Sequence, residues 1–229
     1  MSTQISGEVL QDTLRALGDG NTPAFPMLRM GVPPVASKWD LFALQGRMFN
    51  LSEGTLGTAL TFSANNAAGI VTTAPSIRFT VPSGLTVFPR KLCLALIPGD
   101  TTVDNEIAVM YANTDSYTSG GTAVVPANWR SDNPRATAVT NVVHCSGSAI
   151  IEAAYGTKRV LHQAIYNEAA AFATSYNLNI NYTVEWNDLI PVVGPASFLV
   201  FVSAKTAEVT GYFSLDWAEI PTVSAITAV

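Results

Sequence analysis

The stretch Tyr176-Asn-Leu-Asn-Ile-Asn-Tyr-Thr-Val-Glu-Trp186 decides the fold of this chain, because apolar and polar residues alternate along all of it. In a pleated strand every second side chain lies on the same face, so Tyr182, Val184 and Trp186 share an apolar face with the earlier apolar members. The asparagines and the other polar members take the opposite face. The pattern therefore predicts a strand with one buried and one solvated face, which is typical of an antiparallel sheet.

Two later stretches extend this interpretation. In Gly211–Trp217 the apolar residues Phe213, Leu215 and Trp217 again alternate with polar ones. The stretch Phe198–Val202, in contrast, is apolar at every position. We therefore expect a half-buried strand at the first stretch and a central strand covered on both faces at the second.

Turn residues divide the rest of the chain into further strands, because Pro, Gly, Asn and Asp cluster between the apolar runs. We expect strands at 39–51, 56–63, 76–81, 85–88, 91–97, 106–112, 137–145, 148–154 and 158–166, with a long loop over 113–135 and a helical turn within 167–175. Strands and helices do not alternate, and no repeat of 20 to 50 residues occurs. The prediction is an all-β, antiparallel β-sandwich of jelly-roll type.

The N-terminal region has a different pattern from the rest. Its first part has apolar residues at near-helical spacing before Gly18, which predicts one short amphipathic helix that needs a partner surface. Residues 18–37 form a Pro-punctuated, extended arm with several apolar side chains. We therefore expect a helix and arm over 1–37 and a single sandwich domain over 38–229.

Charge is scarce in this sequence. Asp, Glu, Lys and Arg make up 13% of the residues, about half the share of roughly 25% that is usual in soluble domains. Such a surface is typical of a protein crowded against neighbouring copies, although a secreted sandwich rich in hydroxyl groups is an alternative. The net charge of −5 and the absence of any basic run longer than two residues argue against direct nucleic-acid binding.

No targeting or membrane segment is expected. The first seven residues lack both a basic region and an apolar core, so they do not predict a signal peptide. The longest uncharged stretch, 189–204, contains two prolines and a glycine, and it is shorter than the roughly 20 apolar residues of a membrane helix.

Catalytic residue types are few. The only histidines, His144 and His162, fall in predicted strands beside apolar residues, which favours structural or surface roles. His144 and Cys145 are adjacent in a strand and so point to opposite faces, which argues against a nucleophile–base pair. Cys93 and Cys145 are interpreted as buried thiols rather than a disulfide. No nucleophile elbow, P-loop, dinucleotide fingerprint or zinc motif occurs, so we expect no enzyme and no cofactor.

Two other kinds of site remain open. Asp100, Asp104, Asn105 and Glu106 follow a Pro-Gly turn and could hold calcium through their oxygens, but they lack the twelve-residue calcium-loop pattern, so a solvated loop is favoured. The aromatic residues of the 111–129 region could form a sugar platform, although tryptophans spread over a chain are more typical of core packing or subunit contacts.

In overall profile the chain resembles the jelly-roll structural proteins of viruses. The resemblance covers residues 19–229 and rests on the Pro-rich arm, the single low-charge sandwich, the long loop around Ser119–Pro126 and the apolar, strand-rich C-terminal part. In that family the sandwich tiles a shell while arms and loops clasp neighbouring subunits. The resemblance implies that assembly residues lie in the N-terminal region and in the loop: Leu10, Leu14, Leu17, Phe25, Met27, Leu28, Tyr117 and Trp129.

One departure from that family bears on function. Many small RNA viruses have shell proteins with an arm rich in Arg and Lys, whereas this arm has only Arg15 and Arg29. This favours a DNA bacteriophage-type capsid or a decoration protein. We expect a non-enzymatic, homo-oligomeric capsid subunit in the virion, whose partners are copies of itself and other virion proteins. The alternatives are a virion-surface decoration or glycan/receptor-binding sandwich, and a β-sandwich hydrolase that uses loop carboxylates.

Overall fold

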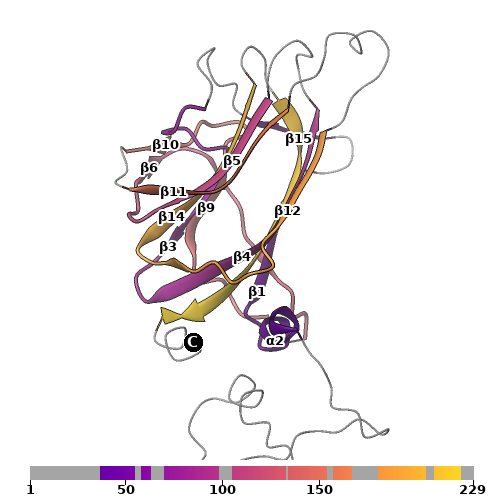
Figure 1. Cartoon of the computed structure of the whole chain (residues 1–229), viewed down its shortest axis with the longest axis vertical. Coiled ribbons are helices and arrows are strands. Elements are labelled where there is room, and N and C mark those ends of the chain that lie inside the picture. Colours follow the sequence, from indigo (N-terminus) through magenta and orange to yellow (C-terminus); the bar gives the residue numbers. More distant parts are fainter. Residues whose placement is uncertain are drawn as a thin grey trace, which may run out of the picture.

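The computed structural model describes residues 37–54, 58–62, 70–97, 105–132, 134–153, 157–166, 180–204 and 209–222. More than half of these residues lie in strands, and one short helix, α2 (Lys38–Leu44), lies at one end (Figure 1). The strands form two large antiparallel sheets and a two-stranded one. The chain is thus a β-sandwich, as the alternating stretches predicted.

The first sheet has the strand order β12-β4-β15-β1-β8, with β13 also paired to β4 and β2 to β15. Its strands are β1 (Met48–Glu53), β2 (Leu60–Phe62), β4 (Leu85–Ile97), β8 (Ala127–Asn128), β12 (Ile180–Glu185), β13 (Val192–Val193) and β15 (Val209–Pro221).

The second sheet has the order β11-β5-β14-β3-β9-β7, and the small sheet pairs β10 with β6. The strands of these two sheets are β3 (Ile77–Val81), β5 (Asn105–Ala112), β6 (Tyr117–Ser119), β7 (Thr122–Ala123), β9 (Thr140–His144), β10 (Ile151–Glu152), β11 (Lys158–Tyr166) and β14 (Ala196–Ala204).

Early strands pair with late ones. β1 pairs with β15, β3 with β14, β4 with β12 and β5 with β11, all antiparallel. The segment 113–157, which we call the long connection, joins β5 to β11. It supplies β8 to the first sheet, β7 and β9 to the second, and both strands of the small sheet. The long connection therefore reaches around the sandwich and contacts both sheets.

The core lies between the two large sheets. Phe79 of β3 stacks on Phe198 of β14 at 4.9 Å and on Trp217 of β15, in the opposite sheet, at 5.1 Å between ring centroids. All three rings are fully buried. Burying an apolar side chain of this size contributes about 1.5–3 kcal/mol, and each ring pair adds about 0.5–1.5 kcal/mol. These contacts join the two sheets.

The three stretches that suggested the fold all form strands, although Asp216 in the 211–217 stretch is buried rather than solvated. In β12 Tyr182 is buried while Asn181 and Thr183 are exposed, and in β15 Phe213 and Leu215 are buried. All of Phe198–Val202 in β14 is buried, and β14 lies between β5 and β3 within its sheet. Residues 176–179 and the turn expected within 167–175 lie outside the described residues.

The prediction of a strand from residue 39 was wrong, because α2 occupies residues 38–44. The Ser37 hydroxyl accepts a hydrogen bond from the Asp40 amide at 3.2 Å, and the Asp40 carboxylate accepts one from the Ser37 amide at 3.1 Å. This capping box starts a helix where the apolar run alone was interpreted as a strand. Trp39 and Phe42 pack with Met48, away from the main core. The helix expected near residues 5–17 lies outside the described residues.

Several further boundaries differ from the prediction, and the strand expected at 148–154 is reduced to the two residues of β10. The strands expected at 85–88 and 91–97 are the single strand β4, because a bulge accommodates Pro89: Pro89 faces Trp217 and Lys91 faces Asp216, with Arg90 as the extra residue. The loop expected over 113–135 contains β6, β7 and β8, since its Gly and Pro residues separate short paired segments.

Candidate assembly surface

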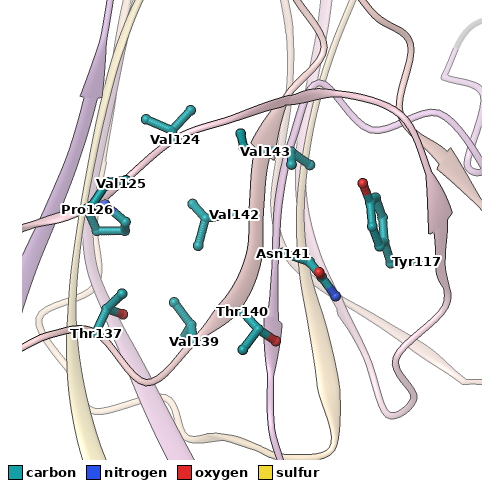
Figure 2. Close-up of a pocket in the computed structure, with 11 residues that line it drawn as sticks. Tyr117, Val124, Val125, Pro126, Thr137, Val139, Thr140, Asn141, Val142 and Val143 are labelled. Carbon is teal, nitrogen blue, oxygen red and sulfur yellow. The ribbon is translucent and has the colours of Figure 1, made fainter.

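An apolar groove of about 400 Å³ lies beside β9 (Figure 2). Figure 2 shows Val124, Val125 and Pro126 along one side, with Val142 between them and Val139. Aliphatic side chains dominate the lining, and the polar contributions come from hydroxyls, one amide and backbone. The lining residues are Tyr117, Ala123, Val124, Val125, Pro126, Thr137, Val139, Thr140, Asn141, Val142 and Val143.

Backbone pairing of the long connection forms this groove. β7 pairs with β9 at Thr122 and Ala123, and the Val124 amide donates to the Val142 carbonyl at 3.0 Å. Pro126 has no amide hydrogen to continue this pairing. Just before β7, the backbone at Gly121 lies close to Val143, since a Cβ at this position would be only 2.8 Å from the Val143 side chain. Gly121 also has a φ of +76°, which glycine adopts readily. The segment 122–126 therefore stops pairing with β9 after Val124, beside the groove.

Val125 stands at the rim of this groove with 89% of its surface exposed. Single exposed aliphatic residues are common on proteins. Here the exposed valine lies beside an apolar groove, and the two together are the candidate interaction surface.

The predicted site residue Tyr117 lies at the end of the groove. Its hydroxyl donates to the Gly120 carbonyl at 2.7 Å, and its ring lies 4.6 Å from the Arg78 guanidinium. Tyr117 is half-buried. It therefore links the groove to the buried polar cluster on the outer face of the second sheet.

That cluster is centred on Arg78, whose side chain is 0% exposed. Arg78 Nε lies 2.8 Å from a Glu152 carboxylate oxygen, and its Nη2 lies 3.1 Å from Asp115 Oδ1 and 2.9 Å from Ser197 Oγ. The Ser116 hydroxyl donates to Glu152 at 2.6 Å. These contacts join β3, β14, β10 and the start of the long connection, so they hold the long connection against the second sheet.

Burial raises the pKa of the Glu152 carboxyl, while the hydrogen bond from Ser116 and the charge of Arg78 act in the opposite direction. Burial has the larger effect because removing a carboxylate from water disfavours its charged form. The charged form of Glu152 is thus stabilised by Ser116 and Arg78 and destabilised more strongly by burial.

The second predicted site residue, Trp129, lies apart from the groove. Its amide donates to the Met48 carbonyl at 3.0 Å, which places it beside β1. Its ring is 4.9 Å from the Arg90 guanidinium, and 45% of its surface is exposed. The structure therefore places Tyr117 and Trp129 at two different surfaces. The other predicted assembly residues, Leu10, Leu14, Leu17, Phe25, Met27 and Leu28, lie outside the described residues.

The residue types considered for catalysis have structural surroundings. Burial lowers the pKa of His144, and its Nδ1 accepts a hydrogen bond from the Ser146 amide at 3.2 Å. His162 packs against the Tyr182 ring at 5.5 Å. Neither Cys93 nor Cys145 forms a disulfide.

The described part of the chain contains no group of three or more His, Cys, Asp or Glu placed to hold a metal ion. Of the acidic residues considered for calcium, Asp100 and Asp104 lie outside the described residues. Glu106 accepts a hydrogen bond from the Ile70 amide at 3.2 Å. No helix among the described residues is both long and apolar enough to cross a membrane.

Comparisons with protein-family models, with curated proteins and with solved structures found no significant match. Function is therefore argued from the site alone.

Sequence reasoning located the long connection but missed half of the groove. Val139 and Val142 fall within an expected strand and are buried, and nothing in their local pattern shows that another segment lies beside them to form a groove. The run Val124-Val125-Pro126 does carry a signal, because two valines and a proline are unusual in an otherwise polar loop.

Proposed function

We propose that this chain is a structural virion protein, a self-assembling capsid subunit built on a jelly-roll sandwich. The strand pairing supports the jelly roll. Taking β1, β3, β4, β5, β11, β12, β14 and β15 in chain order, the first pairs with the last, the second with the seventh, the third with the sixth and the fourth with the fifth. Eight-stranded, two-sheet jelly rolls occur in viral capsid proteins, lectins and cupins, so the fold alone does not select the function.

The observation that carries the assembly proposal is the apolar groove with Val125 at its rim. A subunit contact that covers about 800 Å² per partner is sufficient for specific association. Weak contacts repeated around a closed lattice reinforce one another, so each copy need not bind any one neighbour tightly. The low charge of the chain is consistent with a surface that is largely covered in the assembly.

The proposed occupant of the groove is the N-terminal arm of a neighbouring copy. The arm carries Phe25, Met27 and Leu28 among prolines, a composition suited to an apolar groove and unsuited to free exposure. From Phe25 to Ser37 an extended chain can span roughly 40 Å. The arm is therefore long enough to leave its own sandwich, at the start of α2, and reach another.

The experiment is a mass measurement on the full chain and on a chain lacking residues 1–36, by light scattering with negative-stain imaging. Ser37 is kept because it caps α2. We expect closed particles or regular oligomers from the full chain and their loss without the arm. A monodisperse monomer in both samples would contradict the proposal.

The substitution Val125→Asp tests the groove directly. An exposed position tolerates the change with little loss of stability, within about 0.5 kcal/mol, while a carboxylate at the rim opposes burial of an apolar segment. We expect a folded protein whose assembled mass falls toward that of the monomer. Ile165→Asp on β11, where the isoleucine is 60% exposed, is the matched control. Equal loss of assembly in both variants would show that the groove has no special role.

The alternatives have weaker support from the described residues. A sugar platform at Trp129 would need the neighbouring Asn128 amide, but Asn128 already bonds Gly46, Arg135 and Arg130. Glycoside hydrolysis generally uses two carboxylates across a cleft, and the groove is lined by none.

A further inference from the structure

Four arginines from three separate parts of the sequence gather at the α2 end of the sandwich. The Asn128 side chain brings three of them together. Its Nδ2 donates to the Gly46 carbonyl at 2.9 Å and to the Arg135 carbonyl at 3.2 Å, and its Oδ1 accepts from the Arg130 amide at 2.8 Å. Because Arg47 follows Gly46, one amide fixes three segments that each carry a guanidinium. Arg130 also donates to the Leu44 carbonyl at the end of α2.

The fourth arginine is held by tryptophans. Arg90 is the extra residue of the β4 bulge, and a bulge redirects the side chain that it carries. The Arg90 guanidinium lies 4.9 Å from the Trp129 ring and 5.9 Å from the Trp39 ring. We call Arg47, Arg90, Arg130, Arg135 and Trp129 the arginine–tryptophan corner.

The corner has a small excess of positive charge, because its four arginines and Lys91 face four carboxylates, those of Asp40, Asp132, Glu185 and Glu219. Arg130 pairs with Asp132 at 2.8 Å and Lys91 pairs with Glu185 at 2.7 Å. The hydrogen bonds of its capping box lower the pKa of Asp40, the pairing with Lys91 lowers the pKa of Glu185, and the charge of Arg90 lowers both further. Glu219 is buried and accepts hydrogen bonds from Thr137, Ala138 and Trp217.

The closest positive charges oppose one another. Burial lowers the pKa of Arg47, and the like charge of Arg135 lowers it further. A pair of guanidinium groups held in this way gains from an added anion, because an anion near both relieves their repulsion and replaces the water lost on burial.

We propose that the arginine–tryptophan corner binds single-stranded nucleic acid, with phosphates on the guanidinium groups and a base against the exposed part of Trp129. Arginines that track a backbone beside an aromatic ring on which a base can stack are the usual means of binding single strands. The carboxylates of an acidic protein segment could also pair with the arginines. Such a segment would not supply the flat base that can stack on the indole of Trp129, which is 45% exposed.

This proposal replaces the expectation, drawn from the net charge of −5, that the chain makes no direct contact with nucleic acid. Charges separated by more than about 8–10 Å are largely screened at physiological salt. A local group of arginines can therefore attract phosphates although the whole chain is acidic.

The test is the fluorescence anisotropy of a labelled 20-nucleotide oligothymidylate, titrated with the full chain at several salt concentrations. Two phosphate contacts give a slope of about −1.4 in a plot of log K against log salt, since each contact on a single strand contributes about −0.7. The titration is repeated on Val125→Asp, so that a corner enclosed within particles cannot hide the binding.

Three variants locate the site. Arg135→Gln should reduce the slope by about 0.7 and weaken binding at low salt, whereas Arg159→Gln, which removes the same charge from an exposed position on β11, should change neither. Trp129→Ala should weaken oligothymidylate binding by at least about fivefold, the lower end of the loss for one base–aromatic stack. It should leave the binding of inorganic polyphosphate, which has no bases, unchanged.

Absence of salt-dependent binding, or equal behaviour of Arg135→Gln and Arg159→Gln, would overturn the proposal. Binding of polyphosphate as tight as that of oligothymidylate, with no effect of Trp129→Ala, would also overturn it and point to an acidic protein surface. The two proposals can fail independently. If only the nucleic-acid proposal is wrong, the full chain and Arg135→Gln both assemble but bind no oligothymidylate. If only the assembly proposal is wrong, the chain is a monomer that binds oligothymidylate.

Discussion

Arg78 and Arg90 make the same aromatic contact in opposite surroundings. Their guanidinium groups lie 4.6 Å from the Tyr117 ring and 4.9 Å from the Trp129 ring. Arg78 is fully buried and its charge is met by Glu152 and by Asp115. Arg90 is half-buried on a strand bulge, beside Trp129, which is 45% exposed. The comparison teaches that a stacked arginine does not by itself identify a site: the buried, paired arginine holds the fold, and the open one can bind.

The largest effect is expected from Arg78→Met. Removing one partner of a buried ion pair leaves the other charge uncompensated, which costs about 3–5 kcal/mol. We expect the free energy of unfolding, measured by urea denaturation, to fall by that amount, with the β-sheet circular dichroism signal lost at much lower urea. A loss below about 1 kcal/mol would mean that Asp115 and Glu152 are satisfied without Arg78, and the comparison would fail.

An intermediate effect is expected from Glu152→Gln, and its pH dependence has a definite sign. Because the folded-state pKa of Glu152 is raised above its usual value of 4.5, the folded protein binds this proton more tightly than the unfolded chain. The stability that Glu152 contributes is thus fully present below the unfolded pKa and is lost as the pH rises through the folded pKa.

The stability advantage of the wild type over Glu152→Gln should therefore shrink as the pH rises above the usual carboxyl pKa of 4.5, as seen in urea denaturation at each pH. An advantage that grows with pH would show instead that the charge of Arg78 outweighs burial. This measurement sharpens the comparison of Arg78 with Arg90, because it reports how completely Arg78 compensates the charge of the Glu152 carboxylate.

The smallest effect on stability is expected from Arg90→Met. A partly exposed cation–π contact contributes about 0.5–1 kcal/mol, so the midpoint of urea denaturation should move only slightly. Oligothymidylate binding should weaken at the same time, in contrast to Arg78→Met measured where it is still folded. A stability loss as large as that of Arg78→Met would make Arg90 a structural residue and would remove the basis of the comparison.

The strands could be predicted from the sequence where burial alternates locally. β12 and β15 follow from residues such as Tyr182 and Leu215, because the side-chain period of a strand is two regardless of its partner. β14 follows instead from a short run that is apolar at every position, which is typical of a strand covered on both faces. A signal for α2 is also local, since Ser37 and Asp40 have capping-box spacing; the strand prediction did not take it into account.

The candidate sites could not be predicted in the same way. The groove needs Val125 to face Val142, and the arginine–tryptophan corner needs Arg90 to meet Trp129; both depend on which strands pair and in which register. Such pairing is fixed by tertiary packing, and a single sequence carries no local record of it. The bulge at Pro89 could be suspected from the proline, but the direction that it gives Arg90 could not.

The pairing of early strands with late ones also constrains how this protein is made. Among the described strands, β1 pairs only with β8 and β15, and β5 only with β11 and β14, so the first strands to leave the ribosome have no partners in one another. At about 5–20 residues per second, β5 waits several seconds for β11 and longer for β14, while the loop that must close is long. During that interval the nascent N-terminal half has unpaired strand edges, which are prone to aggregate.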